Sequence, residues 1–218
     1  RVAPGAVDAA EQGLAAGARA LDDARGAAAP RFSQAVSAQM QRLEMGAAQL
    51  VCEQRALPRA SWTRSGASEV EFMFQPGAGM QARPLARIAS GGEVSRVMLA
   101  IKVVLGQADS VDTLVFDEVD AGVGGSVAVA LAEVLADLAR SHQVIVVTHL
   151  AQVAVHGDVH YAVTKIAGDD GMPQTCLRRL SADERPAEIA RMLSGDATEA
   201  SLAHAREMLG AVKGVQGE

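Results

Sequence analysis

The sequence predicts an α/β fold: a mostly parallel sheet flanked by helices, preceded by a helical segment. Two apolar runs, at 114–116 and 144–147, have the length and composition of buried strands, and we expect the first to be covered on both faces of its sheet. Strand patterns alternate with helix patterns from about residue 69 to 212, which favours parallel strands with helices on their faces. Residues 1–57 are rich in Ala and lack the alternation of a strand. We therefore divide the chain into a helical segment, 1–57, and an α/β domain, 58–218.

The second half of the helical segment carries apolar side chains at steps of four, three, four and three: Val36, Met40, Leu43, Ala47 and Leu50. This is the spacing of a helix that packs against another helix in a coiled coil. An amphipathic helix on a globular core produces the same pattern over two heptads, so both interpretations stay open. Pro30 is expected to divide the segment and Pro58 to end it.

Local patterns predict the elements of the α/β domain. Alternation of polar and apolar side chains indicates strands, and an apolar face with a period near 3.6 indicates helices. In chain order we expect a strand at 69–74, a helix beginning near 93, a strand at 114–116, a helix over 126–140, a strand at 144–147, strands near 159–166 and 174–180, and helices over about 183–194 and 198–212. Asp183 and Thr198 are predicted to cap the last two helices.

Composition bears on partners and location. The net charge of −6 does not support nucleic-acid binding by the chain as a whole. No signal peptide opens the chain and no apolar run approaches the ~18 residues of a membrane span, so we expect a cytoplasmic protein. Cys52 and Cys176 lie far apart, which favours small buried hydrophobes over a disulfide. Since the first residue is Arg, we expect a fragment or a processed chain.

Two adjacent carboxylates, Asp117 and Glu118, follow the apolar run at 114–116. Open α/β sheets bind their ligands at the carboxyl ends of the strands. Burial of two neighbouring carboxylates is costly unless a cation or a proton donor is present, so the pair predicts a metal ion with an activated water. The alternative is an acidic cap on the following turn.

Three other segments carry candidate chemistry. Ser90-Gly91-Gly92-Glu93 stands where a helix begins, and two glycines before exposed helix N–H groups suit a phosphate, although a purely structural helix cap fits equally well. Asp120 is the one reactive side chain in a glycine-rich turn, 119–125, that is otherwise typical of a loop. His149 follows the strand at 144–147, where it can donate a hydrogen bond to a phosphate, although a lone His is more often structural.

The order of these four segments resembles the second half of an ATP-binding cassette (ABC) ATPase. In that resemblance Ser90-Gly91-Gly92-Glu93 matches the signature motif, and the run from Leu114 to Asp117 matches the Walker B strand. Glu118 matches the catalytic glutamate, Asp120 the D-loop aspartate and His149 the switch histidine. Four motifs in the correct order are far more specific than any one of them.

Details of the motifs indicate a branch of this family. Transport cassettes usually carry Gln and Pro where Glu93 and Val119 stand, so the chain looks like the ATPases of chromosome maintenance and break repair. Within that branch it resembles the RecN family of bacterial DNA repair proteins over roughly residues 30–210. The positions at which many members differ receive no role: Gly124, Ser126 and Ala151.

The phosphate-binding loop Gly-x-x-x-x-Gly-Lys-[Ser/Thr] is missing from the chain. In RecN-like proteins this loop lies near the amino terminus, before a long antiparallel coiled coil. The resemblance therefore implies a C-terminal part, with 1–57 as the returning end of the coil and 58–218 as the second half of the head. Without the loop, we expect no ATPase activity from this chain alone.

The resemblance implies a homodimer in which two heads enclose ATP and Mg²⁺. Ser90, Gly91, Gly92 and Glu93 would contact the nucleotide of the opposite head; Asp117 would organise Mg²⁺ through water, Glu118 would activate the attacking water, His149 would sense the γ-phosphate, and Asp120 would help to join the heads. The implied role is repair of DNA double-strand breaks at the nucleoid, with DNA and the missing N-terminal half as partners and no membrane. Two alternatives remain: a non-catalytic dimerisation or scaffold module of the same fold, and a transporter cassette, which Glu93 and Val119 disfavour.

Overall fold

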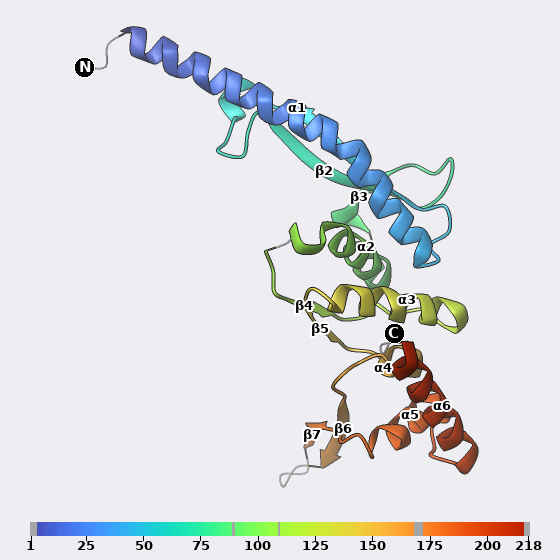
Figure 1. The fold of residues 1–218 in the computed structure, drawn as a ribbon. Helices are drawn as coiled ribbons and strands as arrows, with labels where there is room; N and C mark the ends of the chain where they lie inside the picture. The colour runs from blue at the N-terminus through green and yellow to red at the C-terminus, as the bar shows by residue number, and fades with distance from the viewer. Residues whose placement is uncertain (1–3, 89, 109, 168–171, 216–218) are drawn as a thin grey trace. The chain divides into compact units, whose positions relative to one another are not determined.

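The computed structural model describes residues 4–88, 90–108, 110–167 and 172–215 (Figure 1). Ala89, next to the signature-like segment, lies outside the described residues. The chain forms two compact units, Arg1–Leu105 and Gly106–Glu218, and each is described by itself.

The first unit places one long helix along an antiparallel sheet (Figure 1). Its elements are α1 (Pro4–Arg42), β1 (Gln49–Ala56), β2 (Ser68–Gln75), β3 (Arg83–Pro84) and α2 (Gly91–Leu105), with short 3₁₀ turns at Arg59–Ser61 and Leu85–Arg87. β1 pairs with β2 along its whole length and β2 pairs with β3, both antiparallel. The strand expected at 69–74 and the helix expected near 93 are confirmed as β2 and α2.

The helix α1 differs from its prediction at both prolines. It continues through Pro30 and ends at Arg42, so the expected division at Pro30 and the expected helix up to Pro58 are wrong. Pro30 removes one hydrogen bond, but the flanking turns are rich in Ala, the strongest helix former. The chain then turns at Glu44 and Gly46, both with positive φ, and enters β1.

The apolar residues from Val36 to Leu50, whose spacing suggested one longer helix, are divided between α1, the following turn and β1. Val36, Met40 and Leu43 are buried on α1, which packs against β1 and α2. Leu50 is buried as well, but as a residue of β1, while Ala47 is exposed in the turn. The C-terminal part of α1 is therefore an amphipathic helix packed on a globular core, and not one helix of a coiled coil.

A polar cluster fastens the middle of α1 to the β1–β2 hairpin. The Ser68 hydroxyl donates to Asp22 Oδ1 at 2.6 Å and accepts from Gln54 Nε2 at 3.0 Å. Arg25 Nη2 donates to the carbonyl of Ser65 at 2.8 Å. Ser68 is buried, so its two bonds hold the helix to the sheet partly shielded from water, whereas the bond of Arg25 to Ser65 is exposed.

The second unit contains a parallel pair of strands followed by helices and a hairpin. Its elements are β4 (Thr113–Phe116), α3 (Gly125–Ala139), β5 (Gln143–Val146), α4 (Ala151–Ala154), β6 (Tyr161–Ala167), β7 (Pro173–Arg179), α5 (Arg185–Ser194) and α6 (Glu199–Val215), with a 3₁₀ turn at Gly106–Ala108. These elements confirm those predicted from residue 114 onward. Only β4 and β5 pair in parallel among the described strands, so the prediction of a mostly parallel sheet is too broad, although the α/β class is right.

The β4–β5 pair is covered on one face in the second unit. Leu114 and Phe116 are buried, and α3 contacts β5. On the other face Val115 is 65% exposed and Ile145 is 47% exposed, because alternate residues of a strand point to opposite sides. The expectation that β4 is covered on both faces is therefore wrong for this chain.

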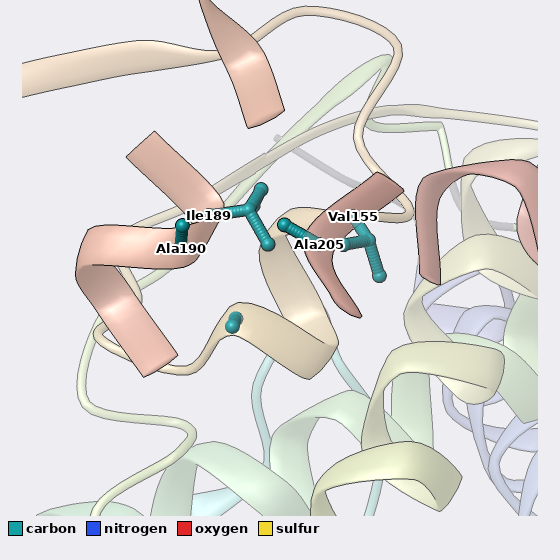
Figure 2. Close-up of a cluster of buried hydrophobic side chains, with 5 residues drawn as sticks. Val155, Ile189, Ala190 and Ala205 are labelled. Atoms are coloured by element: carbon teal, nitrogen blue, oxygen red, sulfur yellow. The ribbon is translucent and has the colours of Figure 1, made fainter. Parts of the chain in front are cut away.

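The end of the chain supports α4. Ala151 and Val155 form one buried cluster with Ile189 and Ala190 of α5 and Ala205 of α6 (Figure 2). A short helix of four residues has little stability alone, so this cluster holds it in place.

The two predicted helix caps have different outcomes. The Thr198 hydroxyl accepts from Ser201 N at 3.2 Å, as expected of a cap. α5 instead begins after Glu184, not at Asp183. The Glu184 carboxylate accepts from Ser181 N and from Arg178, which lowers its pKa to about 2.

Candidate functional site

The signature-like segment lies at the start of α2 in the first unit. Ser90 is exposed, its hydroxyl accepts from Glu93 N at 3.4 Å, and its carbonyl accepts from Val94 N at 3.1 Å. Gly91 is exposed and Gly92 is buried. The segment thus caps the helix, and the exposed first turn also has the form of an anion-binding terminus.

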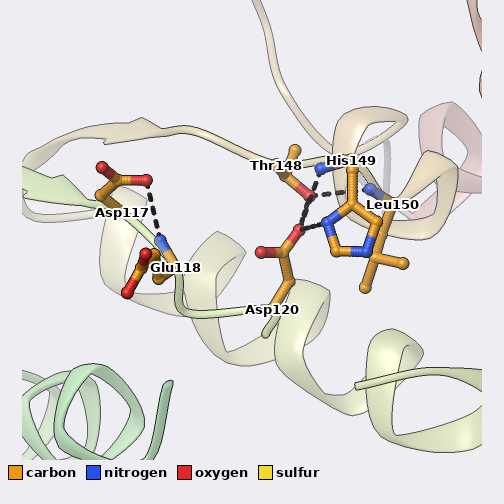
Figure 3. A network of polar contacts seen from close by, with 6 residues as sticks. All are labelled: Asp117, Glu118, Asp120, Thr148, His149 and Leu150. Atoms are coloured by element: carbon orange, nitrogen blue, oxygen red, sulfur yellow. Dashed lines mark hydrogen bonds and ion pairs between the residues drawn. The ribbon is translucent and has the colours of Figure 1, made fainter. Parts of the chain in front are cut away.

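Asp117 and Glu118 follow β4 and are both exposed, so the expectation of a buried pair is wrong for this chain. The Glu118 N–H donates to Asp117 Oδ1 at 2.9 Å (Figure 3). Glu118 has φ 57°, in the left-handed region. For a residue with a Cβ this conformation costs roughly 1 kcal/mol, and such strain concentrates at functional sites.

Asp120 is buried, with 3% of its surface exposed, and its carboxylate is contacted at the oxygen Oδ2 (Figure 3). Asp120 Oδ2 accepts from Thr148 Oγ1 at 2.5 Å and from the His149 N–H at 3.0 Å. It also lies 3.1 Å from His149 Nδ1. The loop after β4 is thereby joined to the segment after β5.

Thr148 connects this cluster to α4. Its hydroxyl oxygen accepts from Leu150 N at 3.0 Å while its proton goes to Asp120. Leu150 is the residue before α4, so the bond fixes the start of that helix. Four residues therefore form one cluster, called here the switch cluster: Asp120, Thr148, His149 and Leu150.

Known proteins similar to this chain were found by sequence. It is 53% identical over 161 residues to the DNA repair protein RecN of Mycobacterium leprae (strain TN), a match that covers 72% of the chain and 27% of the relative. It is 45% identical over 203 residues to RecN of Streptomyces coelicolor, with 88% of the chain and 35% of the relative covered. The chain is a homologue of the RecN proteins.

The RecN relatives are much longer than this chain. RecN of Deinococcus radiodurans is 46% identical over 203 residues, which cover 93% of the chain but 35% of the relative. The chain thus spans about a third of the length of the curated relatives it matches. No protein-family model matches it.

The fold of this RecN homologue has a counterpart among solved structures. The Smc head domain with a coiled coil and joint from Pyrococcus yayanosii superposes with a TM-score of 0.51 at 18% identity, over 70% of this chain and 27% of that one. The predicted fold class, α/β with the fold of part of such a head domain, is confirmed.

The strand-end carboxylates of this chain fit a Mg²⁺ site only in part. Asp117 offers an exposed carboxylate, and proteins commonly hold Mg²⁺ through one or two carboxylates, with water and substrate phosphates completing the shell. Across residues 4–88, 90–108, 110–167 and 172–215, no three His, Cys, Asp or Glu side chains gather in a way that could hold a metal ion. Asp117 therefore suits a water-mediated role and not a protein cage.

The structure brings some predicted residues together and adds one. Asp117, Glu118, Asp120 and His149 lie on the loops after β4 and β5, whereas Ser90–Glu93 belong to the first unit. Thr148 was not predicted as a site residue. Its position before His149 at the end of a strand was the available signal, since a hydroxyl there can bond to a neighbouring strand-end carboxylate.

Among the described helices, none is long and apolar enough to cross a membrane.

Proposed function

We propose that this chain is the C-terminal part of a RecN-like ATPase that acts in recombination and DNA double-strand break repair, hydrolysing ATP between two heads. The observation that carries the proposal is the contact of Asp120, two residues after Glu118, with His149 on the segment after β5. The homology to RecN proteins supports the same activity.

In this proposal the strand-end side chains have separate tasks. Bound Mg²⁺ would neutralise charge on the ATP phosphates, and Asp117 would hold it through water. Glu118 would orient and deprotonate the attacking water, for which its exposed carboxylate is available. His149, with a side chain that is 70% exposed, would contact the γ-phosphate.

The second head would complete the site. Ser90, Gly91, Gly92 and Glu93 would contact the γ-phosphate bound to the opposite head, where the start of α2 favours an anion. The loop that carries Asp120 would lie near the contact between the heads. The proposal therefore requires a homodimer, because each nucleotide needs the Ser90–Glu93 segment of the opposite head.

The missing N-terminal half would supply the phosphate loop. Support comes from the open face of the β4–β5 pair, where Val115 and Ile145 are exposed, as expected of a sheet that awaits further cover. On α1, Val7 and Leu14 are exposed seven residues apart, the spacing of one coiled-coil seam. Opening and closing of the heads would move this arm and couple hydrolysis to DNA bridging in the cytoplasm, at the nucleoid.

Replacement of Glu118 by Gln in the full-length protein tests the proposal. We expect the turnover of ATP to fall at least ~100-fold, because loss of a general base has that effect, while nucleotide-dependent dimers persist. Glu199→Gln, on the exposed start of α6, is the matched control and should keep wild-type turnover. The 218-residue chain alone should show no turnover.

Two outcomes would contradict this proposal. Unchanged turnover in Glu118→Gln would remove Glu118 from the role of base. Absence of Mg²⁺-dependent turnover in the wild-type full-length protein, with dimers still present, would favour the non-catalytic scaffold.

A further inference from the structure

Asp120 is the one carboxylate among the buried polar residues of the described chain, which are Ser68, Asp120 and His142. A buried carboxylate is costly unless hydrogen-bond donors surround it. Here two hydrogen-bond donors, the Thr148 hydroxyl and the His149 N–H, converge on a single oxygen, and the ring nitrogen Nδ1 of His149 lies 3.1 Å from the same oxygen. Such convergence indicates that the carboxylate is built to hold the segment after β5.

The contact with His149 distinguishes the two ring nitrogens. A carboxylate oxygen only accepts, so the 3.1 Å contact between Nδ1 and Asp120 Oδ2 favours a proton on Nδ1. The opposite nitrogen, Nε2, is then the one left to exchange a proton with a ligand. The ring is 70% exposed, so nothing in its own burial would select this orientation.

Two further bonds make the orientation rigid. The Thr148 hydroxyl and the His149 N–H hold Oδ2 at hydrogen-bond distance independently of the ring. Thr148 in turn accepts from Leu150 N and fixes the first turn of α4. The carboxylate is therefore an anchor whose position the backbone determines, and the His149 ring aligns on it (Figure 3).

We propose that Asp120 is a positioning residue that acts through His149 of its own chain, holding the Nδ1–H tautomer so that Nε2 faces the reacting phosphate. The proposal rests on the proposed ATPase function. It differs from a direct role of Asp120 in joining two heads, for which a carboxylate with 3% exposure and an engaged oxygen is poorly placed. The same logic holds the catalytic histidine of hydrolytic triads in one tautomer.

Nitrogen NMR of the chain, labelled with ¹⁵N-histidine and free of nucleotide, tests the tautomer directly. In the wild type we expect the His149 signals of a protonated Nδ1, assigned by their loss in His149→Gln. In Asp120→Ala the ring should redistribute toward protonated Nε2. Asp183→Ala, an exposed carboxylate of the same unit, should leave the signals unchanged. Unchanged His149 signals in Asp120→Ala would overturn the proposal.

Asp120→Asn guards against a folding defect. Its amide oxygen can still accept from Thr148 and from the His149 N–H, so the fold should persist. The uncharged oxygen holds the ring proton less strongly, and we expect a tautomer ratio between those of wild type and Asp120→Ala. A wild-type ratio in both Asp120 variants would reject the proposal even where one of them is partly unfolded.

A functional double-mutant cycle in the full-length protein separates positioning from head joining. If Asp120 acts through His149, Asp120→Ala combined with His149→Ala should be no slower than His149→Ala alone, and Asp120→Ala should keep nucleotide-dependent dimers. Losses that multiply, or loss of the dimers, would return Asp120 to the contact between heads. Absence of wild-type turnover would reject the ATPase function, while the NMR result would still decide the role of Asp120.

Discussion

The switch cluster begins at Asp120, two residues after the acidic pair Asp117–Glu118, and the two regions differ in how complete they are. Asp120 is buried and takes three contacts at one oxygen, whereas Asp117 and Glu118 are exposed. The cluster is preorganised by groups that this chain contains. The pair is placed by the backbone, with Glu118 in a strained conformation, and the proposal leaves its metal and nucleotide to the rest of the protein. The switch cluster is thus preorganised within this chain, whereas the proposed role of the acidic pair depends on groups from outside it.

The largest expected effect concerns the support beneath the switch cluster. Ile189 is fully buried in the cluster that holds α4 (Figure 2). Ile189→Ala should lower the free energy of unfolding of the second unit by about 3 kcal/mol, because a buried Ile→Ala change costs the transfer energy and leaves a cavity. Chemical denaturation measures the change in the free energy of unfolding, and hydrogen exchange of the α4 amides shows whether that helix is destabilised.

Leu177→Ala serves as the control for that change, since Leu177 is 64% exposed on β7. Its effect should stay within about 0.5 kcal/mol. Equal losses from the two substitutions would show that the cluster around α4 is not the support of the switch cluster.

A smaller loss is expected from Thr148→Val, which keeps the shape of the side chain and removes its hydroxyl. Asp120 Oδ2 loses a donor and the Leu150 N–H loses its acceptor. We expect a destabilisation of about 2 kcal/mol, since partly buried groups are left unpaired. Thr113→Val is the matched control: its hydroxyl makes an exposed bond to Gln143. A change at Thr148 no larger than at Thr113 would mean that the switch cluster is not preorganised.

How far the sequence predicts this molecule depends on which forces act locally. Strands and helices after residue 113 follow from periodicity, and the resemblance of the motifs to ABC ATPases places Asp117, Glu118 and His149 at strand ends. β1 was missed because Leu50 continued the apolar period of α1 across a turn. The period cannot reveal that Glu44 and Gly46 adopt positive φ.

Burial was harder to predict than location. An apolar run predicted that both faces of β4 are covered, but cover depends on elements outside the run, and Val115 is exposed in this chain. Asp120 looked like part of a flexible loop, because a glycine-rich turn carries no sign of a partner 28 residues away. Long-range pairing of side chains leaves no periodic signal in one sequence.

The strain at Glu118 predicts an effect of opposite sign to those in the switch cluster. Relative to Glu118→Ala, which keeps a Cβ at φ 57°, Glu118→Gly should raise the free energy of unfolding by roughly 0.5 kcal/mol. At Glu133, on the exposed face of α3, the same Ala-to-Gly comparison should lower it by about 1 kcal/mol. Denaturant midpoints of the four variants measure both differences. If Gly is the worse residue at both positions, the left-handed conformation of Glu118 is not the preferred state of the loop.

The smallest expected effect is a pH dependence in the second unit. Burial lowers the pKa of His156, and burial together with Arg185 lowers the pKa of His160. Because the folded state binds the proton less tightly than the unfolded state, stability is unaffected well above the ordinary histidine pKa of ~6.5 and falls as pH drops below it. Denaturation midpoints should therefore decline from pH 7.5 to 5.5. His160→Asn should flatten part of that decline, whereas His204→Asn, on the exposed side of α6, should leave it intact. A decline that persists unchanged in His160→Asn would assign it to His156 or to the carboxylates, and would show that burial of His160 adds nothing to the acid sensitivity of the region that supports α4.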